Sequence, residues 1–273
     1  MQIHETAFVV STYRSHHEEV SKDIYAKLWN NPSTDNLIPE IIENISKHEA
    51  VLHSIRNRFF YEQMRSFFLA NNGGTLINFG SGFSMYQFLL NENVRTIEID
   101  KTDIVAYKKE KVDLWTNEGK LPKRDIQYVS IDFTAHSKEE IVSSLKPYIK
   151  QGPIFILLEG VLFFLDLDTT NTLFKVFKEL QQTGDQVGSV SYLPDIENTE
   201  VYRRLLHYFD ANNNTNDPFM HQTIPHNFYE NINGYFLKKI SDEFELSKIY
   251  APNMDITDRK EILNENLYIL QKE

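Results

Sequence analysis

Two glycines and one carboxylate stand at a spacing that could hold a nucleotide. Gly80 and Gly82 follow directly after the apolar segment 76–79, and Asp100 comes twenty residues after Gly80. Glycine lets the backbone turn sharply and approach a ligand closely, and a carboxylate can accept hydrogen bonds from the hydroxyls of a ribose. This order of strand, glycine turn, short helix and acidic strand end is typical of the front half of a nucleotide-binding βαβ unit.

The glycine turn narrows the choice of nucleotide. A dinucleotide fingerprint G-x-G-x-x-G needs a small residue at the sixth position, where this chain has the bulky Met85. The sequence also contains no phosphate-binding G-x-x-x-x-G-K-[ST] loop. A two-glycine turn followed by an acidic strand end is used by S-adenosylmethionine (SAM) methyltransferases, although a plain turn between two strands would also fit this stretch alone.

The ends of the other predicted strands add further candidate ligands. The first five strands are predicted at residues 76–79, 94–99, 126–131, 154–158 and 186–192. Ligands of an open α/β sheet bind outside the carboxyl ends of its strands. The candidate binding residues at those ends are Gly80, Ser81, Gly82, Glu98, Asp100, Asp132, Phe133, Glu159, Gly160 and Tyr192. Carboxylates suit SAM, because its ribose, adenine and ammonium groups are hydrogen-bond donors and its sulfonium is positive.

Alternating strands and helices from residue 75 onward predict a parallel sheet with helices on both faces. Helices are predicted at residues 5–30, 37–47, 49–71, 85–90, 104–118, 138–148, 168–182 and 228–239. Two more strands, at 244–250 and 266–270, bring the predicted number to seven. We therefore expect an α/β fold with a Rossmann-like seven-stranded sheet of the class I SAM methyltransferase type, in which the last strand is antiparallel.

The predicted elements divide the chain into a cap and a core. Residues 1–72 are expected to form an N-terminal helical cap, and residues 73–273 the SAM-binding core. Segment 208–234 is rich in asparagine, aromatic residues and histidine. We expect an irregular lid there, at about residues 195–235, because long loops after the fifth strand often cover a substrate. Its histidines are more typical of surface residues than of a catalytic base.

Composition excludes several classes of site and partner. The chain has 273 residues, 41% of them hydrophobic, which suits one large domain or one domain with a cap. It has no cysteine, so disulfides, thiolate metal sites and cysteine nucleophiles are excluded, and we expect no metal. The net charge of -11 argues against a nucleic-acid partner. The absence of a long apolar run or a basic start predicts no membrane span or signal peptide, and the lack of cysteine fits the expected cytoplasmic location.

Four stretches, in order, resemble the motifs of one family. Residues 5–14 (ETAFVVSTYR) resemble an N-terminal "T-A…A…R" helix, and residues 79–83 (FGSGF) an "L-G-x-G-x-D" turn. Residues 97–100 (IEID) resemble "(F)-E-V-D", and residues 158–165 (LEGVLFFL) resemble "E-G-V-L-x-Y-L". The chain thus resembles the leucine carboxyl methyltransferase family of SAM-dependent O-methyltransferases, including its bacterial branch of polyketide-type biosynthesis.

The resemblance implies a role for each part of the predicted site. The implied SAM ligands are Asp100 for the ribose hydroxyls, Asp132 and Phe133 for the adenine, Glu159 for the ammonium, and Gly80 with Gly82 beneath the methionine. Arg58 resembles the family arginine that binds the SAM carboxylate, a bidentate task suited to a guanidinium. Arg14 is a second candidate for the same task.

The methyl acceptor is less defined than the cofactor. Methyl transfer is an in-line displacement with a neutral leaving group, so the protein mainly positions and desolvates the nucleophile. A carboxylate acceptor needs no base, whereas a hydroxyl would benefit from one. The candidate holders of an acceptor carboxylate are Tyr192, Arg203, Arg204 and Tyr208, and the acceptor could be a small molecule or a protein C-terminus. One alternative is a non-catalytic module that binds SAM or a nucleotide and acts as a sensor or partner. A less favoured alternative is an NAD-dependent oxidoreductase.

Overall fold

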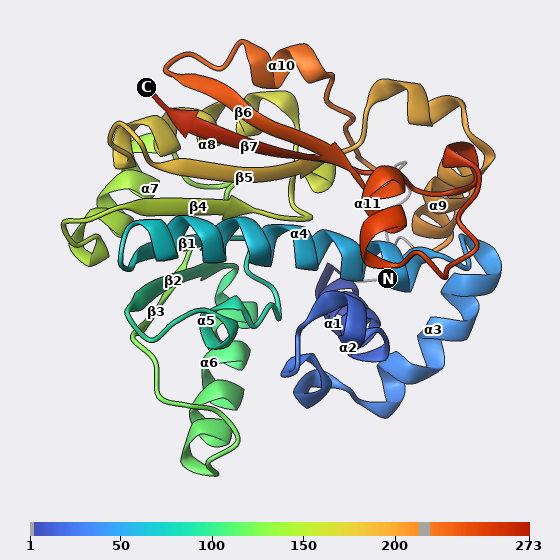
Figure 1. Ribbon diagram of the computed structural model, residues 1–273, viewed down its shortest axis with the longest axis horizontal. Helices are drawn as coiled ribbons and strands as arrows, with labels where there is room; N and C mark the ends of the chain where they lie inside the picture. Colours follow the sequence, from blue (N-terminus) through green and yellow to red (C-terminus); the bar gives the residue numbers. More distant parts are fainter. Residues whose placement is uncertain (1–2, 213–218) are drawn as a thin grey trace.

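A seven-stranded sheet forms the centre of the protein. The computed structural model describes residues 3–212 and 219–273 (Figure 1). The strands are β1 (Gly74–Phe79), β2 (Val94–Asp100), β3 (Ile126–Ser130), β4 (Ile154–Leu158), β5 (Gln186–Ser191), β6 (Tyr235–Asp242) and β7 (Asn266–Lys272). Their order is β3-β2-β1-β4-β5-β7-β6, and β7 runs antiparallel to both of its neighbours. The predicted fold class, including the antiparallel last strand, is confirmed.

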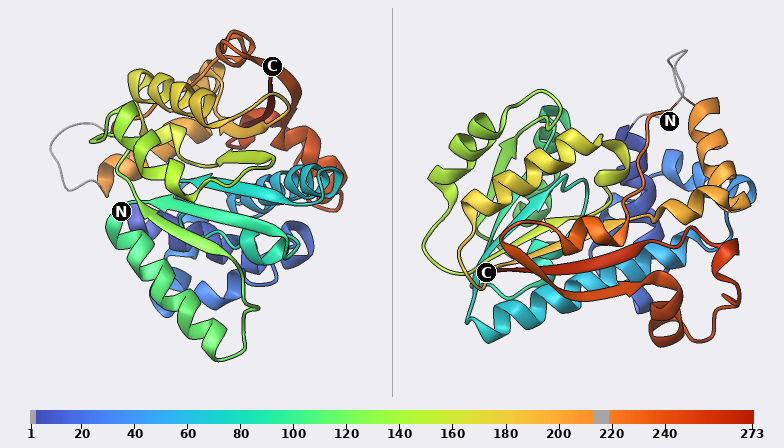
Figure 2. Two further views of the ribbon diagram at one scale, coloured as in Figure 1. Left: turned by 90° about the vertical axis from the view of Figure 1, so that its left-hand side faces the viewer. Right: turned by 90° about the horizontal axis from the view of Figure 1, so that it is seen from above.

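Helices cover both faces of this sheet, as Figure 2 shows. One face carries α4 (Glu49–Ala70), α5 (Tyr86–Leu89) and α6 (Thr102–Asn117), and the other carries α7 (Lys138–Leu145), α8 (Leu167–Leu180) and α10 (His226–Glu230). The central strand β4 explains why: Phe155 and Leu157 enter one hydrophobic core and Ile156 and Leu158 the other. An apolar strand of this kind is stable only when both faces are buried.

A third group of helices lies over the carboxyl ends of the parallel strands. These helices are α1 (Ile3–His16), α2 (Glu18–Ser21), α3 (Pro32–Asn44) and α9 (Glu200–Ala211), seen at the ends of β4 and β5 in Figure 1. Val9 of α1, Ile41 of α3 and Leu205 of α9 lie in one core, whereas Val20 of α2 lies in the core that includes α4. By contrast, α4 packs directly on the sheet. The segment 1–72, which was predicted to form a cap, therefore contributes to two different layers.

Short 3-10 turns complete the chain, at Ala26–Trp29, Lys146–Tyr148, Leu162–Phe164, Pro194–Asn198 and Arg259–Glu261, and α11 (Glu243–Tyr250) packs beside α4. No helix within residues 3–212 and 219–273 is long and apolar enough to cross a membrane.

Two predictions near the C-terminus were wrong in type. The predicted helix 228–239 is a short helix that ends at Glu230, and a turn with Gly234 at φ +84° then leads into β6. The predicted strand 244–250 is α11, which begins where the Asp242 side chain accepts a hydrogen bond from the Glu245 N–H.

Two further predictions need correction. The single helix predicted at 5–30 is interrupted, since Lys22 adopts a left-handed conformation that stops α2. The region 195–235 is not an irregular loop throughout, because α9 occupies its first part with Leu205 and Tyr208 buried. Residues 213–218 of that region lie outside the described residues.

Candidate active site

A cavity of about 290 Å³ opens at the carboxyl ends of the parallel strands. Its walls come from the segments after β1, β2, β3 and β4 and from α1, α3, α4 and α9. The predicted site residues that line it are Arg14, Gly80, Ser81, Gly82, Asp100, Asp132, Phe133, Glu159, Gly160 and Tyr192. This is the place where sheets of this kind bind their ligands.

The glycine turn after β1 has no room for a side chain. Gly80 has φ +66°, and a Cβ at this position would lie 2.2 Å from Cγ2 of Val161. Gly82 has φ +43° and donates its N–H to Asp100 Oδ2 at 2.8 Å. The first glycine lets β1 and the segment after β4 approach closely, and the second aligns the carboxylate of Asp100.

Asp100 is held at the end of β2 by two backbone groups. Besides the bond from Gly82, the Lys101 N–H donates to Asp100 Oδ1 at 2.8 Å. Burial raises the pKa of this carboxyl, and the two N–H groups oppose that effect. Each carboxylate oxygen accepts one hydrogen bond from the chain, which leaves lone pairs for hydroxyl groups of a ligand.

Asp132 and Phe133 form the next part of the wall, after β3. The Thr134 hydroxyl donates to Asp132 Oδ1 at 2.7 Å and lowers the pKa of this carboxyl. Phe133 packs against Phe79 of β1, with ring centroids 5.6 Å apart. An ionised carboxylate beside an aromatic face can bind both the amino edge and the plane of a purine.

Glu159 lies in a buried ionic network that the sequence did not predict. Arg56 of α4 donates to Glu159 Oε1 at 2.9 Å and also pairs with Glu265, which precedes β7. The Tyr86 hydroxyl donates to Glu159 Oε2 at 2.7 Å. Although burial alone would lower the pKa of Arg56, the Glu265 and Glu159 carboxylates raise it well above its usual range. Arg56 therefore stays charged and fixes Glu159, while Gly160 passes close to its guanidinium.

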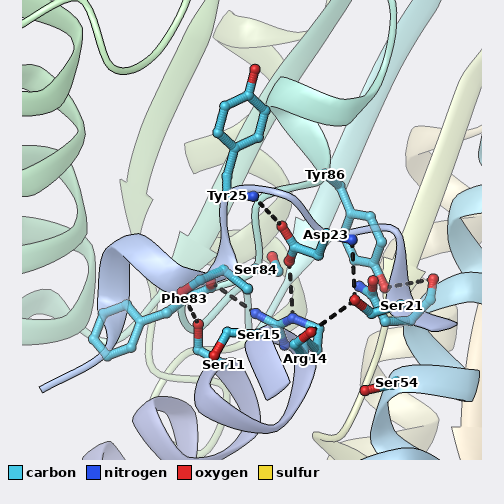
Figure 3. A network of polar contacts seen from close by, with 12 residues as sticks. Ser11, Arg14, Ser15, Ser21, Asp23, Tyr25, Ser54, Phe83, Ser84 and Tyr86 are labelled. Atoms are coloured by element: carbon cyan, nitrogen blue, oxygen red, sulfur yellow. Dashed lines mark hydrogen bonds and ion pairs between the residues drawn. The ribbon is translucent and has the colours of Figure 1, made fainter. Parts of the chain in front are cut away.

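Arg14 reaches the cavity from α1 and is almost wholly buried. Its Nε donates to Asp23 Oδ2 at 3.0 Å, and its Nη2 donates to the Phe83 carbonyl at 3.0 Å (Figure 3). A guanidinium has five N–H donors, so these two bonds fix its plane and leave others for a ligand. The contact to Phe83 also joins α1 to the glycine turn.

Glu98 lies behind the cavity rather than on its wall. It pairs with Lys108 of α6 at 2.6 Å, and both side chains are fully buried. Lys108 also donates to the carbonyl of Ser81 at 3.3 Å. Glu98 therefore supports the glycine turn through Lys108 instead of facing a ligand.

The structure places three predicted arginines away from the cavity. Arg58 pairs with Glu62, one turn further along α4, and its guanidinium lies 5.5 Å from the centre of the Tyr250 ring. Arg203 is exposed and pairs with Glu200, and Arg204 is exposed as well. Tyr192, in contrast, is buried on the cavity wall.

The cavity also has a largely apolar wall with a few polar groups. Its apolar wall includes Ile41, Phe163, Leu165, Leu205 and Phe209. Its polar groups, apart from the residues already described, include Tyr13, Glu49, His53 and Tyr208. Tyr13, Glu49 and His53 were not predicted as site residues from the sequence. Across the described ranges 3–212 and 219–273, no group of three or more His, Asp or Glu side chains is arranged to hold a metal.

Solved structures resemble this fold at low sequence identity. A protein assigned as a methyltransferase from Thermobifida fusca has a TM-score of 0.64 at 13% identity, covering 89% of this chain and 90% of that one. A duf574 family protein from Streptomyces avermitilis has a TM-score of 0.64 at 12% identity, covering 96% and 100%. Magnesium protoporphyrin IX methyltransferase from Synechocystis, solved with S-adenosylhomocysteine (SAH), has a TM-score of 0.51 at 8% identity, covering 95% and 98%.

Sequence comparison identifies the family. No curated protein matches the chain. The family model of leucine carboxyl methyltransferase matches residues 12–178, a stretch that contains the glycine turn, Asp100, Asp132 and the segment around Glu159. Because this match spans more than half of the chain, the protein belongs to the leucine carboxyl methyltransferase family and is a SAM-dependent methyltransferase.

Proposed function

We propose that the protein methylates the carboxylate of a small organic acid, with SAM bound along the strand ends. In this proposal Asp100 binds the ribose hydroxyls, and Asp132 with Phe133 holds the adenine. Two backbone N–H groups orient the carboxylate of Asp100, and the lowered pKa of Asp132 keeps its carboxyl ionised. Both observations support these roles. SAM supplies the methyl group, and the protein's residues orient it.

The methionine end of SAM would lie over the glycine turn. Glu159 keeps lone pairs for the ammonium group, since Arg56 and Tyr86 each use one oxygen. For the carboxylate of SAM we favour Arg14 over Arg58, because Arg14 lines the cavity with N–H donors to spare and Arg58 lies outside it. Arg56 is committed to Glu159 and Glu265, so it holds the site together instead.

The observation that carries the carboxylate proposal is the hydroxyl of Tyr13. This side chain is 2% exposed on the cavity wall, and its hydroxyl has no hydrogen-bond partner within the described residues. Burial, and then the nearby Glu49, raises the pKa of Tyr13 well above its usual range. Burial, and then Glu265, raises the pKa of Tyr192 well above its usual range as well. Both tyrosines therefore remain protonated donors, and donors are what a carboxylate requires.

The reaction then needs little acid or base chemistry. One carboxylate oxygen attacks the sulfonium methyl, the new O–CH3 bond forms as the S–CH3 bond breaks, and the sulfur leaves as a neutral thioether. The acceptor is already ionised at neutral pH. The protein's contribution is to align the two reactants against the largely apolar wall of the cavity.

The product distinguishes a carboxylate from other acceptors. We would incubate the protein with methyl-labelled SAM and a matched set of phenylpropanoate, phenylpropanol and phenylpropylamine, together with aliphatic acids. A methyl ester releases labelled methanol in mild alkali, whereas a methyl ether or methylamine does not. The proposal expects alkali-labile label from the acids alone. Alkali-stable label from the alcohol or the amine would refute carboxylate methylation.

A further inference from the structure

Three neighbouring polar side chains on the cavity wall each have an unsatisfied atom. Among the described residues, Tyr13 Oη, Glu49 Oε1 and His53 Nδ1 have no hydrogen-bond partner. Tyr13 and His53 stack with centroids 5.4 Å apart, and His53 Nε2 lies 3.7 Å from Glu49 Oε2. Tyr13 and Glu49 are 2% and 5% exposed. Buried polar atoms without partners are costly, so this cluster is suited to the polar group of a ligand in the cavity.

The groups that face Glu49 determine its charge. His53 and Arg56 are on α4, and Tyr13 is on α1. Tyr192 follows β5, Glu265 precedes β7, and Glu243 begins α11. Both nearby arginines already have carboxylate partners. Arg56 pairs with Glu159 and Glu265, and Arg14 pairs with Asp23.

Within residues 3–212 and 219–273, no cation is therefore paired with Glu49 alone. Burial, and then the charges of Arg56 and Arg14, lowers the pKa of His53 well below its usual range, so this ring is neutral. Burial and the Glu265 carboxylate raise the pKa of Glu49 to about 8, against the opposing effect of Arg56. At neutral pH the Glu49 carboxyl thus carries a proton and can act as a hydrogen-bond donor.

We propose that protonated Glu49 and the Tyr13 hydroxyl together bind one oxygen of the acceptor carboxylate, leaving the other oxygen free to attack the methyl group. The inference rests on the proposed carboxylate acceptor and assigns the residues that select it. Two neutral donors can bind an anion in a cavity that also contains Glu159 and Glu265, and a hydroxyl acceptor would gain less from them. A charged Glu49 would repel the acceptor, so binding is lost once this carboxyl ionises.

A general base at the same position would behave in the opposite way. If Glu49 removed a proton from a hydroxyl acceptor, its ionised form would be the active one and the rate would rise with pH. Glu49→Gln separates the two, because an amide N–H₂ can still donate a hydrogen bond but cannot accept the proton of a hydroxyl.

The first experiment needs no acceptor. Infrared difference spectra of wild type against Glu49→Gln, at pH 7 and with SAH bound, are expected to contain the carbonyl band of a protonated carboxyl that fades above about pH 8. A spectrum that contains only the bands of an ionised carboxylate at pH 7 would overturn the inference.

The second experiment measures kcat/KM for phenylpropanoate, or for the best acid of the set, between pH 6 and pH 10. Wild type is expected to lose about tenfold per pH unit above about pH 8. Glu49→Gln should show no such loss and stay within about tenfold of wild type at pH 7, whereas Glu49→Ala should lose about tenfold or more, mainly through KM.

The control is Glu62→Gln, on the same helix but outside the cavity, which should leave the profile unchanged. A loss of a hundredfold or more in Glu49→Gln, or a wild-type rate that rises with pH, would overturn the inference even if the product is an ester. Failure of the proposed function appears separately, as an alkali-stable product.

Discussion

Replacing Glu49 by glutamine should stabilise the folded protein, and by an amount that depends on pH. Glu49 is buried, and its pKa rises from the ordinary 4.5 to about 8 on folding. Below pH 4.5 the carboxyl is protonated in both states. As pH rises from there, the unfolded chain ionises first, so the folded state loses relative stability until Glu49 itself ionises at about pH 8.

The size of this effect follows from the difference between the two pKa values. At about 1.4 kcal/mol per pH unit, the interval from 4.5 to about 8 is worth about 5 kcal/mol above pH 8 and about 3 kcal/mol at pH 7. Glutamine does not titrate and has nearly the same shape. The stability gained by Glu49→Gln should therefore be smallest at the acid end and grow as pH rises.

Urea unfolding at pH 5, pH 7 and pH 8.5 would measure the gain, with the free energy of unfolding extrapolated to water for each protein. Glu62→Gln serves as the matched control, because hydrogen bonds from Tyr250 and Arg58 lower the pKa of Glu62 despite an opposing effect of burial. If the difference between wild type and Glu49→Gln is the same at all three pH values, the carboxyl is not held neutral and the reasoning is refuted.

Three further substitutions test the rest of the site. Gly80→Ala should destabilise by about 2–4 kcal/mol through its left-handed backbone and the contact with Val161, and chemical denaturation should show this cost reduced, not abolished, in a Val161→Ala background. Lys108→Ala leaves Glu98 buried without its partner and should cost about 3–5 kcal/mol; a cost below 1 kcal/mol in the same assay would argue against the buried pair. Tyr13→Phe should raise the KM for the acid about tenfold without changing SAM affinity, and weaker SAM binding would contradict its placement beside the acceptor.

The sheet and its glycine turn could be predicted because their signals are local. An apolar run such as Ile154–Leu158 is stable only inside a sheet covered on both faces, and the structure places it there. The turn at Gly80 and Gly82 needs φ values that favour glycine, so the residue type indicates the backbone. The order of the strands is then sufficient to place Asp100 and Asp132 at the same edge of the sheet.

The sequence does contain a signal for which arginine of α4 is buried. Arg56 lies four residues after Leu52 and four before Phe60, on the buried face of the helix. Arg58 lies four residues before Glu62, on the outer face, where the two pair. The motif resemblance favoured Arg58, whereas helical periodicity would have favoured Arg56 as the buried residue.

Other features depend on contacts between distant parts of the chain. The raised pKa of Glu49 arises from burial and then from the Glu265 carboxylate, while Arg56 is paired with two other carboxylates. No local sequence pattern predicts these contacts. The predicted strand 244–250 failed for a local reason instead. Asp242 caps α11, and this capping signal outweighed the apolar and aromatic residues that suggested a strand.

Calorimetric titration with SAM, of wild type and of Asp100→Ala, tests the central claim that SAM lies in this cavity with its ribose on Asp100. Wild type should bind SAM, Asp100→Ala should bind at least tenfold more weakly because hydrogen bonds to a charged carboxylate are lost, and Glu62→Gln should match wild type. Absence of binding by the wild type, or an unchanged affinity in Asp100→Ala, would contradict it.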